Sequence, residues 1–258
     1  MTCPTTAILD GDIIAYRAAC WAEVEGFDCL EDRLNDDIHK IWTPKKADSV
    51  VVAFSCSRRV NYRRSFWPNY KANRDNTASP DFLGDCKDYL MNNWDHVIEP
   101  RLEADDLIGI HTSSETMIGV TIDKDLLSVP GYHWNPNKDK EIRYVSEEEA
   151  NRFFYKQWMM GDTTDGVPGL WRIGPKRADK LLDSWDPVEW EKQIFRMYDD
   201  PKYAPEPSLL PNLLALAMAR SVRILRYGDY DFETKTIELW NPKQEVYDPI
   251  VGYSDDKE

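Results

Sequence analysis

The stretch that decides the fold runs from Trp158 to Leu182 and reads WMMGDTTDGVPGLWRIGPKRADKLL. An apolar helix end leads into two carboxylates, Asp162 and Asp165, and a glycine-rich connection then leads into a basic helix. Glycine adopts backbone conformations that other residues resist, so tight turns with outward-facing N–H groups fit between the two helices. The pattern therefore predicts two helices joined by a loop that is suited to phosphate groups.

The start of the second helix supports the same interpretation. Pro175 suits the first helical position, and it places Lys176 and Arg177 beside the positive end of the helix dipole. Together with Gly174, these residues would contact the backbone of a nucleic acid rather than its bases. An ordinary connection between helices has the same glycines and proline, but it does not need two carboxylates directly upstream.

The overall charge points in the opposite direction. Of the 258 residues, 46 are acidic and 32 are basic, which gives a formal net charge of −14. Averaged over the molecule, this is the wrong sign for a protein that binds nucleic acid. A carboxylate cluster neutralised by metal ions would account for part of the excess, so the local basic segments carry more weight than the sum.

The cysteines and the N-terminus indicate the compartment. The five cysteines are scattered and show no CxxC spacing, which is typical of reduced thiols in a cytosolic protein. The first residues lack a basic segment followed by an apolar one, and no apolar run approaches the length of a membrane span. We therefore expect a soluble, cytoplasmic protein that makes no membrane contact.

Acidic residues follow two apolar segments that have strand character. Asp10 comes after residues 7–9, and Asp123 and Asp125 come after residues 117–122. Open α/β folds bind their ligands at the carboxyl ends of parallel strands, so these acids are expected at a functional edge. Asp12 is expected to cap the helix that follows, and the alternative is that it supports a metal site without binding the ion directly.

A third group of acids enters an apolar helix after a short strand at residues 96–98. Glu103, Asp105 and Asp106 occupy three of four successive positions. Such a group is unfavourable unless cations neutralise it or the helix dipole stabilises it. Hard divalent cations prefer oxygen ligands, so the pattern favours a metal site.

Residues 58–74, RRVNYRRSFWPNYKANR, form the basic segment that the net charge conceals. Guanidinium and ammonium groups bind phosphate, and aromatic rings offer faces on which unpaired bases stack. Arg63, Tyr70, Lys71 and Arg74 are therefore candidate DNA contacts. A solvated loop that covers its own aromatic side chains would have the same composition.

Several motifs together resemble the 5′-to-3′ exonuclease and flap endonuclease family, over nearly the whole chain up to Tyr227. They are G-D-x-x-D-x-x-P-G at residues 161–169, I-G-P-K-x-A at 173–178, Y-K-x-N-R at 70–74, E-A-D-D-x-I at 103–108 and D-x-D-L-L at 123–127. The resemblance implies a nuclease that hydrolyses phosphodiester bonds at 5′ ends, nicks or flaps of duplex DNA during replication or repair. RNA·DNA hybrids are a further candidate substrate. It also implies a monomer and, for a phage-encoded member, the cytoplasm of a bacterial host.

The resemblance assigns roles to individual residues. It implies two Mg²⁺ or Mn²⁺ ions per active site, and it places Lys71 and Arg74 at the scissile phosphate as catalytic residues. Gly174, Lys176 and Arg177 would bind DNA within a helix-three-turn-helix, where a K⁺ site is a further expectation. The implied metal ligands are Asp10, Glu103, Asp105, Asp106, Asp123, Asp125, Asp162 and Asp165.

The chain departs from the family pattern in three places. Ser55 stands where relatives carry an aspartate at the end of the strand predicted for residues 49–54, and it can offer only a weak ligand or a hydrogen bond to water. Arg172 replaces a small residue. Residues 75–80 are all that separates Arg74 from the next helix, which leaves no room for a large helical arch.

Alternating strands and helices predict an α/β fold with a mostly parallel central sheet flanked by helices, as in PIN-like and resolvase-like nuclease cores. We expect the nuclease core in residues 1–145 and a helix-three-turn-helix module with C-terminal helices in residues 146–258. Helices are expected at residues 30–42, 82–94, 146–160, 186–198 and 213–227, a hairpin at 132–145 and a strand at 232–240.

Two other functions remain open at this point. A PIN-like ribonuclease would share the carboxylate core but ordinarily lacks the helix-three-turn-helix. A catalytically weak DNA-binding module is the second alternative, and Ser55 is its only support. Metal-dependent degradation of duplex DNA, RNA·DNA hybrid and single-stranded RNA would distinguish the three.

Overall fold

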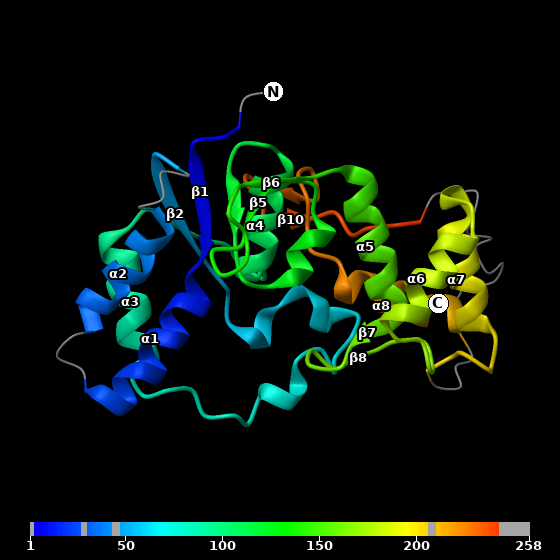
Figure 1. The fold of residues 1–258 in the computed structure, drawn as a ribbon. Helices are drawn as coiled ribbons and strands as arrows, with labels where there is room; N and C mark the ends of the chain where they lie inside the picture. Colours follow the sequence, from blue (N-terminus) through cyan, green and yellow to red (C-terminus); the bar gives the residue numbers. More distant parts are fainter. Residues whose placement is uncertain (1–2, 27–29, 43–46, 206–209, 243–258) are drawn as a thin grey trace.

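The fold is built on a central six-stranded sheet. The computed structural model describes residues 3–26, 30–42, 47–205 and 210–242. Strand order in the sheet is β3-β2-β1-β4-β5-β6, and all neighbours are parallel except β5 and β6 (Figure 1). The strands are β1 Thr6–Asp10, β2 Ser49–Phe54, β3 His96–Ile98, β4 Ile118–Val120, β5 Gly131–Trp134 and β6 Arg143–Val145. The expected mostly parallel sheet is therefore confirmed.

Helices cover both faces of this sheet because its central strands are apolar on both sides. On β1, Ala7 and Leu9 pack into the core beneath α1 (Gly11–Glu25), α2 (Leu30–Trp42) and α3 (Leu83–Asn93). Ile8 points the other way, into the core beneath α4 (Ala104–Ser113). Figure 1 shows α1, α2 and α3 on one side of the sheet and α4 on the other.

Four further helices form a helical half beside the sheet (Figure 1). Its helices are α5 (Glu147–Met160), α6 (Pro175–Ser184), α7 (Trp190–Asp199) and α8 (Pro211–Val222). Trp158 is fully buried at their centre, and its indole N–H donates to the Ala215 carbonyl at 2.8 Å. The predicted capping box is confirmed, since Ser146 and Glu149 bond to each other's backbone N–H at the start of α5.

The connection between α5 and α6 turns back on itself through a minimal antiparallel ribbon of β7 (Gly161–Asp162) and β8 (Val167–Pro168). Gly161 has φ 65°, a left-handed conformation that favours glycine. A side chain on Gly169 would lie 2.0 Å from the Met160 carbonyl carbon. The two glycines therefore allow the backbones to cross, and the crossing sets the direction in which Asp162 leaves α5.

Five short 3₁₀ helices lie between the longer elements of the described chain. They are η1 (Arg58–Val60), η2 (Tyr62–Ser65), η3 (Ala72–Arg74), η4 (Lys124–Ser128) and η5 (Pro187–Glu189). Between η3 and α3, residues 75–82 contain no helix, in agreement with the absence of a large arch.

Three predicted elements differ from the structure. The strand expected at 232–240 is a two-stranded hairpin, β9 (Tyr230–Asp231) and β10 (Thr236–Ile237), because the Asp231 side chain accepts the N–H groups of its turn. The helix expected at 213–227 ends at Val222, where the backbone bonds to distant side chains instead. The helix expected from residue 186 begins as η5 and becomes α7 at Trp190.

Two further observations concern the molecule as a whole. The domain boundary at residue 145 stays a prediction, and residues 243–258 of the second unit lie outside the described residues. Within the ranges that the structure describes, each helix is too short or too polar to cross a bilayer.

Candidate active site

The predicted acids meet in one large cavity between the carboxyl edge of the sheet and the helical half. Its volume is about 1370 Å³. Seven of the eight predicted metal ligands line it, together with Lys71 and Arg74. The seven are Asp10, Glu103, Asp105, Asp123, Asp125, Asp162 and Asp165.

The fold brings these acids together from four elements. Asp10 ends β1, and residue 123 follows the neighbouring strand β4, so their side chains meet at the edge of the sheet. Asp10 also caps α1, because its Oδ1 accepts the N–H of Ile13 at 3.0 Å. Asp123 caps η4 in the same way and accepts the N–H of Asp125 at 2.9 Å. The cap expected from Asp12 is therefore made by Asp10.

Burial and mutual repulsion disfavour the charged form of several of these acids. Burial raises the pKa of Asp10 to about 7, with further contributions from Asp12 and Asp123. The pKa of Asp105 lies well above its usual value because of burial, followed by the charges of Asp10 and Asp123. Burial also raises the pKa of Asp125 to about 7, and Asp123 and Asp162 add to the shift.

The donor set fits divalent cations. The Oδ1 atom of Asp105 is buried and has no hydrogen-bond partner, so a buried oxygen is left to accept a ligand. Hard cations prefer carboxylate oxygens, and their charge would relieve the repulsion that raises these pKa values. In the conformation described, no group of three or more His, Cys, Asp or Glu side chains within the described ranges is arranged so that it could hold a metal ion. The assignment of individual ligands stays a prediction.

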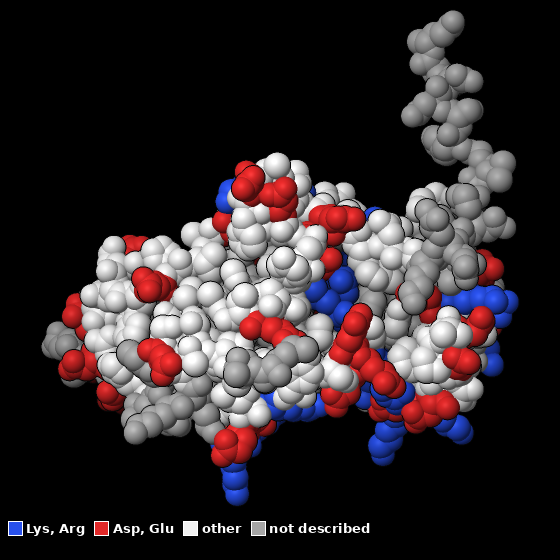
Figure 2. All heavy atoms as spheres, turned by 90° about the horizontal axis from the view of Figure 1, so that it is seen from above, with Lys and Arg blue, Asp and Glu red and all other residues white. Residues whose placement is uncertain are grey.

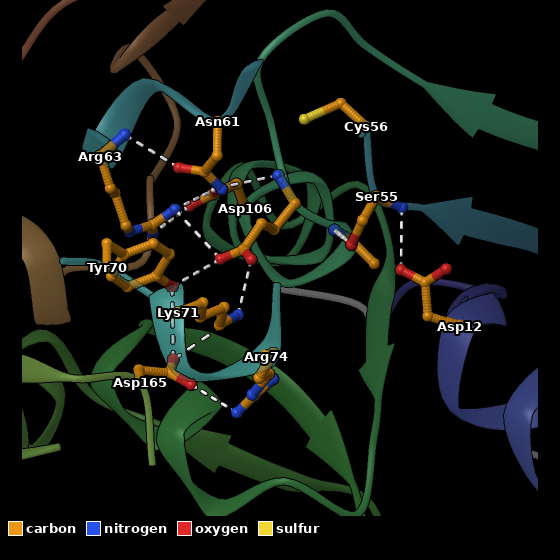
Figure 3. Close-up of polar contacts among 12 residues, drawn as sticks. Asp12, Ser55, Cys56, Asn61, Arg63, Tyr70, Lys71, Arg74, Asp106 and Asp165 are labelled. Carbon is orange, nitrogen blue, oxygen red and sulfur yellow. Dashed lines mark hydrogen bonds and ion pairs between the residues drawn. The ribbon is translucent and has the colours of Figure 1, made fainter. Parts of the chain in front are cut away.

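Two cations lie against the acids from one side of the cavity. Lys71, which has a left-handed backbone at φ 52°, donates to Glu103 and lies 3.5 Å from a carboxylate oxygen of Asp165 (Figure 3). The guanidinium of Arg74 donates to the other Asp165 oxygen at 2.6 Å. Burial raises the pKa of Glu103, but Lys71 and then Arg63 outweigh this effect and hold the pKa below its usual value.

Arg63 and Asp106 differ from their predicted roles. Arg63 was expected to contact DNA, yet it is only 2% exposed and lies bidentate on Asp106, with both bonds at 2.7 Å (Figure 3). Asp106 is fully buried, does not line the cavity, and also accepts the N–H groups of Glu103 and Leu225. We therefore place both residues in a buried structural ion pair, in which Arg63 borders the cavity and Asp106 lies behind it.

Tyr70 is also buried rather than available to DNA. It is 4% exposed, and its hydroxyl donates to Glu103 at 2.7 Å and lies 3.3 Å from Asp165. A ring in this position cannot stack on a base. Tyr70 instead fixes the orientation of Glu103.

Ser55 is engaged within the protein. Its Oγ accepts the N–H of Ala104, the first residue of α4, at 2.9 Å, and its own N–H donates to Asp12 at 2.9 Å. Asp12 also pairs with Lys87 of α3. Sequence reasoning missed Lys87, because nothing in the sequence around a single helical lysine indicates that it pairs with Asp12, just beyond the end of β1.

The segment from Ser221 to Leu225 was also missed. Its carbonyl groups at Ser221 and Arg223 accept hydrogen bonds from Arg63, at 3.1 and 2.7 Å. These pairs are separated by about 160 positions in the chain, so no local pattern could have indicated them.

The start of α6 lies at the margin of the cavity. Gly174 and Pro175 line the cavity, whereas Lys176 and Arg177 project from the exposed surface. Gly174 has an extended backbone, and the space where a side chain would lie is open. Figure 2 shows how uneven the surface charge is: acidic side chains are scattered over the face in view, and Lys and Arg side chains project mainly from its lower edge.

Comparisons with known proteins agree with this geometry. No protein-family model matches the chain. The chain is 26% identical to the exonuclease of Escherichia phage T7, with 91% of this chain and 93% of that protein covered. It is 27% identical to the exodeoxyribonuclease of Enterobacteria phage T3, with 92% of each covered. A DNA polymerase I of Rhizobium leguminosarum is 30% identical over 82% of this chain and 22% of its own length.

Solved structures share the fold at lower identity. The T5 D15 protein co-crystallised with metal ions superimposes with a TM-score of 0.59 at 16% identity, covering 84% of this chain and 85% of that one. The catalytic core of Rad2 in complex with DNA substrate superimposes with a TM-score of 0.51 at 14% identity, covering 95% and 78%.

Proposed function

Because the chain belongs to the 5′-to-3′ exonuclease and flap endonuclease family, we propose that it is a divalent-metal-dependent nuclease that hydrolyses phosphodiester bonds at the 5′ ends, nicks or flaps of duplex DNA. The observation that carries the proposal is the cavity that seven of the predicted carboxylates line together with Lys71 and Arg74, which pair with Glu103 and Asp165. RNA·DNA hybrids as a substrate, a monomeric state and a K⁺ site near Arg172 are further expectations of the same proposal.

The residues divide into two sets around the metal ions. Two Mg²⁺ or Mn²⁺ ions would supply Lewis acidity and a water of lowered pKa when bound. Asp10, Glu103, Asp105 and Asp123 would hold the first, and Asp125, Asp162 and Asp165 the second, directly or through water. Asp106 takes no part, because Arg63 occupies both of its oxygens.

Lys71 and Arg74 would bind the phosphate that is cut. Each carries its positive charge at the cavity wall beside Glu103 or Asp165. Burial lowers the pKa of Lys71, but Glu103 and Asp165 outweigh burial and raise the pKa, so the ammonium stays charged. Positive charges that are already held next to the phosphate stabilise the negative charge that develops in the transition state, and the protein does not have to reorganise during the reaction.

The start of α6 would hold the duplex away from the cut. Gly174 leaves room for close approach of a phosphate to the backbone, and Lys176 and Arg177 add charge beside it. These contacts carry no base information, so we expect the enzyme to recognise the shape of a 5′ end rather than a sequence.

One assay tests the proposal. Cleavage of 5′-labelled duplex DNA, RNA·DNA hybrid and single-stranded RNA is measured with Mg²⁺ and with excess EDTA. We expect Asp105→Asn to lower cleavage of the duplex by at least about a hundredfold, because several kcal/mol of transition-state stabilisation goes with a lost metal ligand. Binding of the duplex should persist. The matched control is Asp37→Asn, the same change at a surface ion pair of α2.

Each contrary outcome has a distinct meaning. Cleavage that persists in EDTA would contradict the metal-dependent mechanism. Preference for single-stranded RNA would favour a PIN-like ribonuclease. DNA binding without cleavage in Mg²⁺ would favour the DNA-binding module.

A further inference from the structure

The cavity extends beyond the acids on the side away from α6. On that side its wall is made by α1, by α3 and by residues 77–79. Figure 1 shows α1 and α3 at one end of the molecule and α6 at the other. The cavity volume of about 1370 Å³ exceeds the roughly 300–1000 Å³ of ordinary small-molecule pockets. The cavity therefore has room for more than metal ions and a single phosphate.

One face of each helix forms this part of the wall. On α1, Ile13, Tyr16 and Arg17 line the cavity at the three- and four-residue spacing of a helix face. On α3, Leu83 and Lys87 line it at a spacing of four. We call these five residues the α1–α3 wall. It brings two positive charges, from Arg17 and Lys87, to the cavity on the side opposite α6.

Asp12 holds the Lys87 side chain at this wall. One Asp12 oxygen pairs with the Lys87 ammonium, and the other accepts the N–H of Ser55 at 2.9 Å (Figure 3). An ammonium has three N–H donors, and Asp12 is its one acceptor among the residues that the structure describes. The Lys87 side chain is 30% exposed. Two donors therefore remain for a ligand in the cavity.

The fold does not depend on this ion pair. The two helices already pack together through buried apolar side chains, among them Ala18 and Ala22 of α1 and Leu90 of α3. An ion pair that water can reach adds little to stability, because water screens the charges. The position of Lys87 beside the acids is therefore better explained by a ligand than by a link between helices.

The position of the wall identifies the part of the substrate that reaches it. In the proposed function, Lys71 and Arg74 bind the scissile phosphate and the start of α6 holds the duplex. The cleaved strand continues past the metal ions, away from that duplex, toward its own 5′ end. Its next phosphate therefore lies on the side of the cavity where the α1–α3 wall stands. An ammonium with unused donors is suited to bind that phosphate.

We propose that Lys87, held by Asp12, binds the phosphate one nucleotide to the 5′ side of the cut, on the strand that is cleaved. The inference rests on the proposed function and adds a contact to the piece that departs. With this contact the strand is held on both sides of the bond that breaks, which aligns that bond with the metal ions.

A substrate with one neutral phosphate tests this contact. The cleavage site is first mapped on a duplex with a short 5′ flap, and a methylphosphonate then replaces the phosphate one nucleotide 5′ of that site. We expect kcat/KM of the wild type in Mg²⁺ to fall about tenfold on the neutral substrate, because a charge-assisted hydrogen bond is lost. Lys87→Met and Lys87→Gln should be about tenfold slower on the natural substrate and lose little more on the neutral one. Lys87→Arg, which keeps the charge, should retain most of the wild-type response.

The matched control is Lys192→Met, the same change at an ion pair on α7 outside the cavity. It should keep the wild-type rate and the full response to the neutral phosphate. A third substrate carries the methylphosphonate on the complementary strand, where wild type and Lys87→Met should respond alike.

Two results would overturn the inference and leave the proposed function intact. One is a wild type that cuts the natural and the neutral flap at the same rate. The other is an equal loss for wild type and Lys87→Met on the neutral flap, because a lysine that only links two helices slows the cutting of every substrate by the same factor. A wild type that cuts no unmodified flap or duplex in Mg²⁺ would overturn the proposed function as well.

Discussion

Arg63 carries its charge inside the protein because each of its N–H groups has an acceptor. Its Nε donates to the Ser221 carbonyl, and its terminal nitrogens donate to Asp106, Glu103 and the Arg223 carbonyl. Charge attraction alone does not stabilise a buried ion pair of this kind. It is stable because every N–H group of the guanidinium has a hydrogen-bond acceptor. Arg64, the next residue, pairs with Asp75 at the surface.

The two neighbouring arginines therefore give a matched test. We expect Arg63→Met to lower the free energy of unfolding by about 3–5 kcal/mol, because Asp106 would remain buried without its partner. Arg64→Met should have a far smaller effect, since water screens its ion pair. Urea denaturation of both variants measures the difference. Equal losses of unfolding free energy in the two variants would mean that burial does not determine how much an ion pair stabilises this protein.

His133 makes stability depend on pH at a site away from the acids. Burial lowers its pKa from 6.5 to about 4, and its Nε2 lies 2.8 Å from the Val129 carbonyl. Below pH 6.5 the unfolded chain binds a proton that the folded protein rejects, so the folded state loses stability as the pH falls toward 4. Above pH 6.5 this contribution is constant.

We expect the advantage of wild type over His133→Gln, measured as free energy of unfolding, to shrink by on the order of 2–3 kcal/mol between neutral pH and pH 4. Urea titrations at several pH values in EDTA provide the measurement. His96→Gln, the same change at an exposed histidine, is the matched control. A parallel course for His133→Gln and wild type would show that folding does not lower the pKa of His133.

At the scale of elements, the loop from α5 to α6 uses its glycines for two different purposes. Gly169 passes so close to α5 that an added Cβ would overlap the Met160 backbone at 2.0 Å. Gly174, which caps α6, has nothing within 4 Å of that position and a φ of −99°, which other residues adopt. The first glycine is required by packing and the second is not.

The two glycine-to-alanine changes should therefore separate folding from binding. Gly169→Ala should lower stability by about 2 kcal/mol or more, because backbone atoms cannot yield to the new methyl group. Gly174→Ala should fold with wild-type stability or slightly better, since alanine restricts the unfolded chain. It should nevertheless weaken duplex binding, because the methyl group fills the space that a phosphate would approach. Thermal melting measures the stability of each variant, and fluorescence anisotropy on the same samples measures its affinity for duplex DNA. Wild-type affinity of Gly174→Ala for duplex DNA would rule out a contact between a phosphate and the backbone at Gly174.

At the scale of the whole molecule, the segment between η3 and α3 contributes Thr77, Ala78 and Ser79 to the cavity wall. Residues 75–82 pass from the basic motif to the sheet side of the molecule without forming a helix (Figure 1). The described chain thus has no helical arch at this place. A substrate would enter from the side rather than through a closed aperture.

We expect blunt and nicked 5′ ends to be cut readily, and a streptavidin-capped 5′ flap to be cut at a rate only modestly below that of the free flap. A free strand need not pass through the protein, so a bulky adduct should obstruct little. Initial rates on capped and uncapped flaps of the same sequence give the comparison. Complete inhibition by the cap would mean that the strand is threaded.

The sequence by itself determined the elements whose signals are local. The bounds of α2 and β2 follow from hydrophobic spacing, and the start of α5 follows from a capping box of adjacent residues. It also indicated seven of the acids that line the cavity, but it included the buried Asp106 and left out Asp12. Asp10, Asp123 and Asp125 were indicated because the carboxyl ends of parallel strands meet at one edge.

Only the tertiary structure decided which of the polar residues at the cavity stay accessible and which are buried by their partners. The sequence makes Arg63, Tyr70 and Arg74 look alike, yet the first two are enclosed by the segment after α8 and by Glu103, while Arg74 remains partly exposed. The physical reason is distance along the chain. A buried charge is fixed by partners far away in sequence, and local spacing carries no information about them.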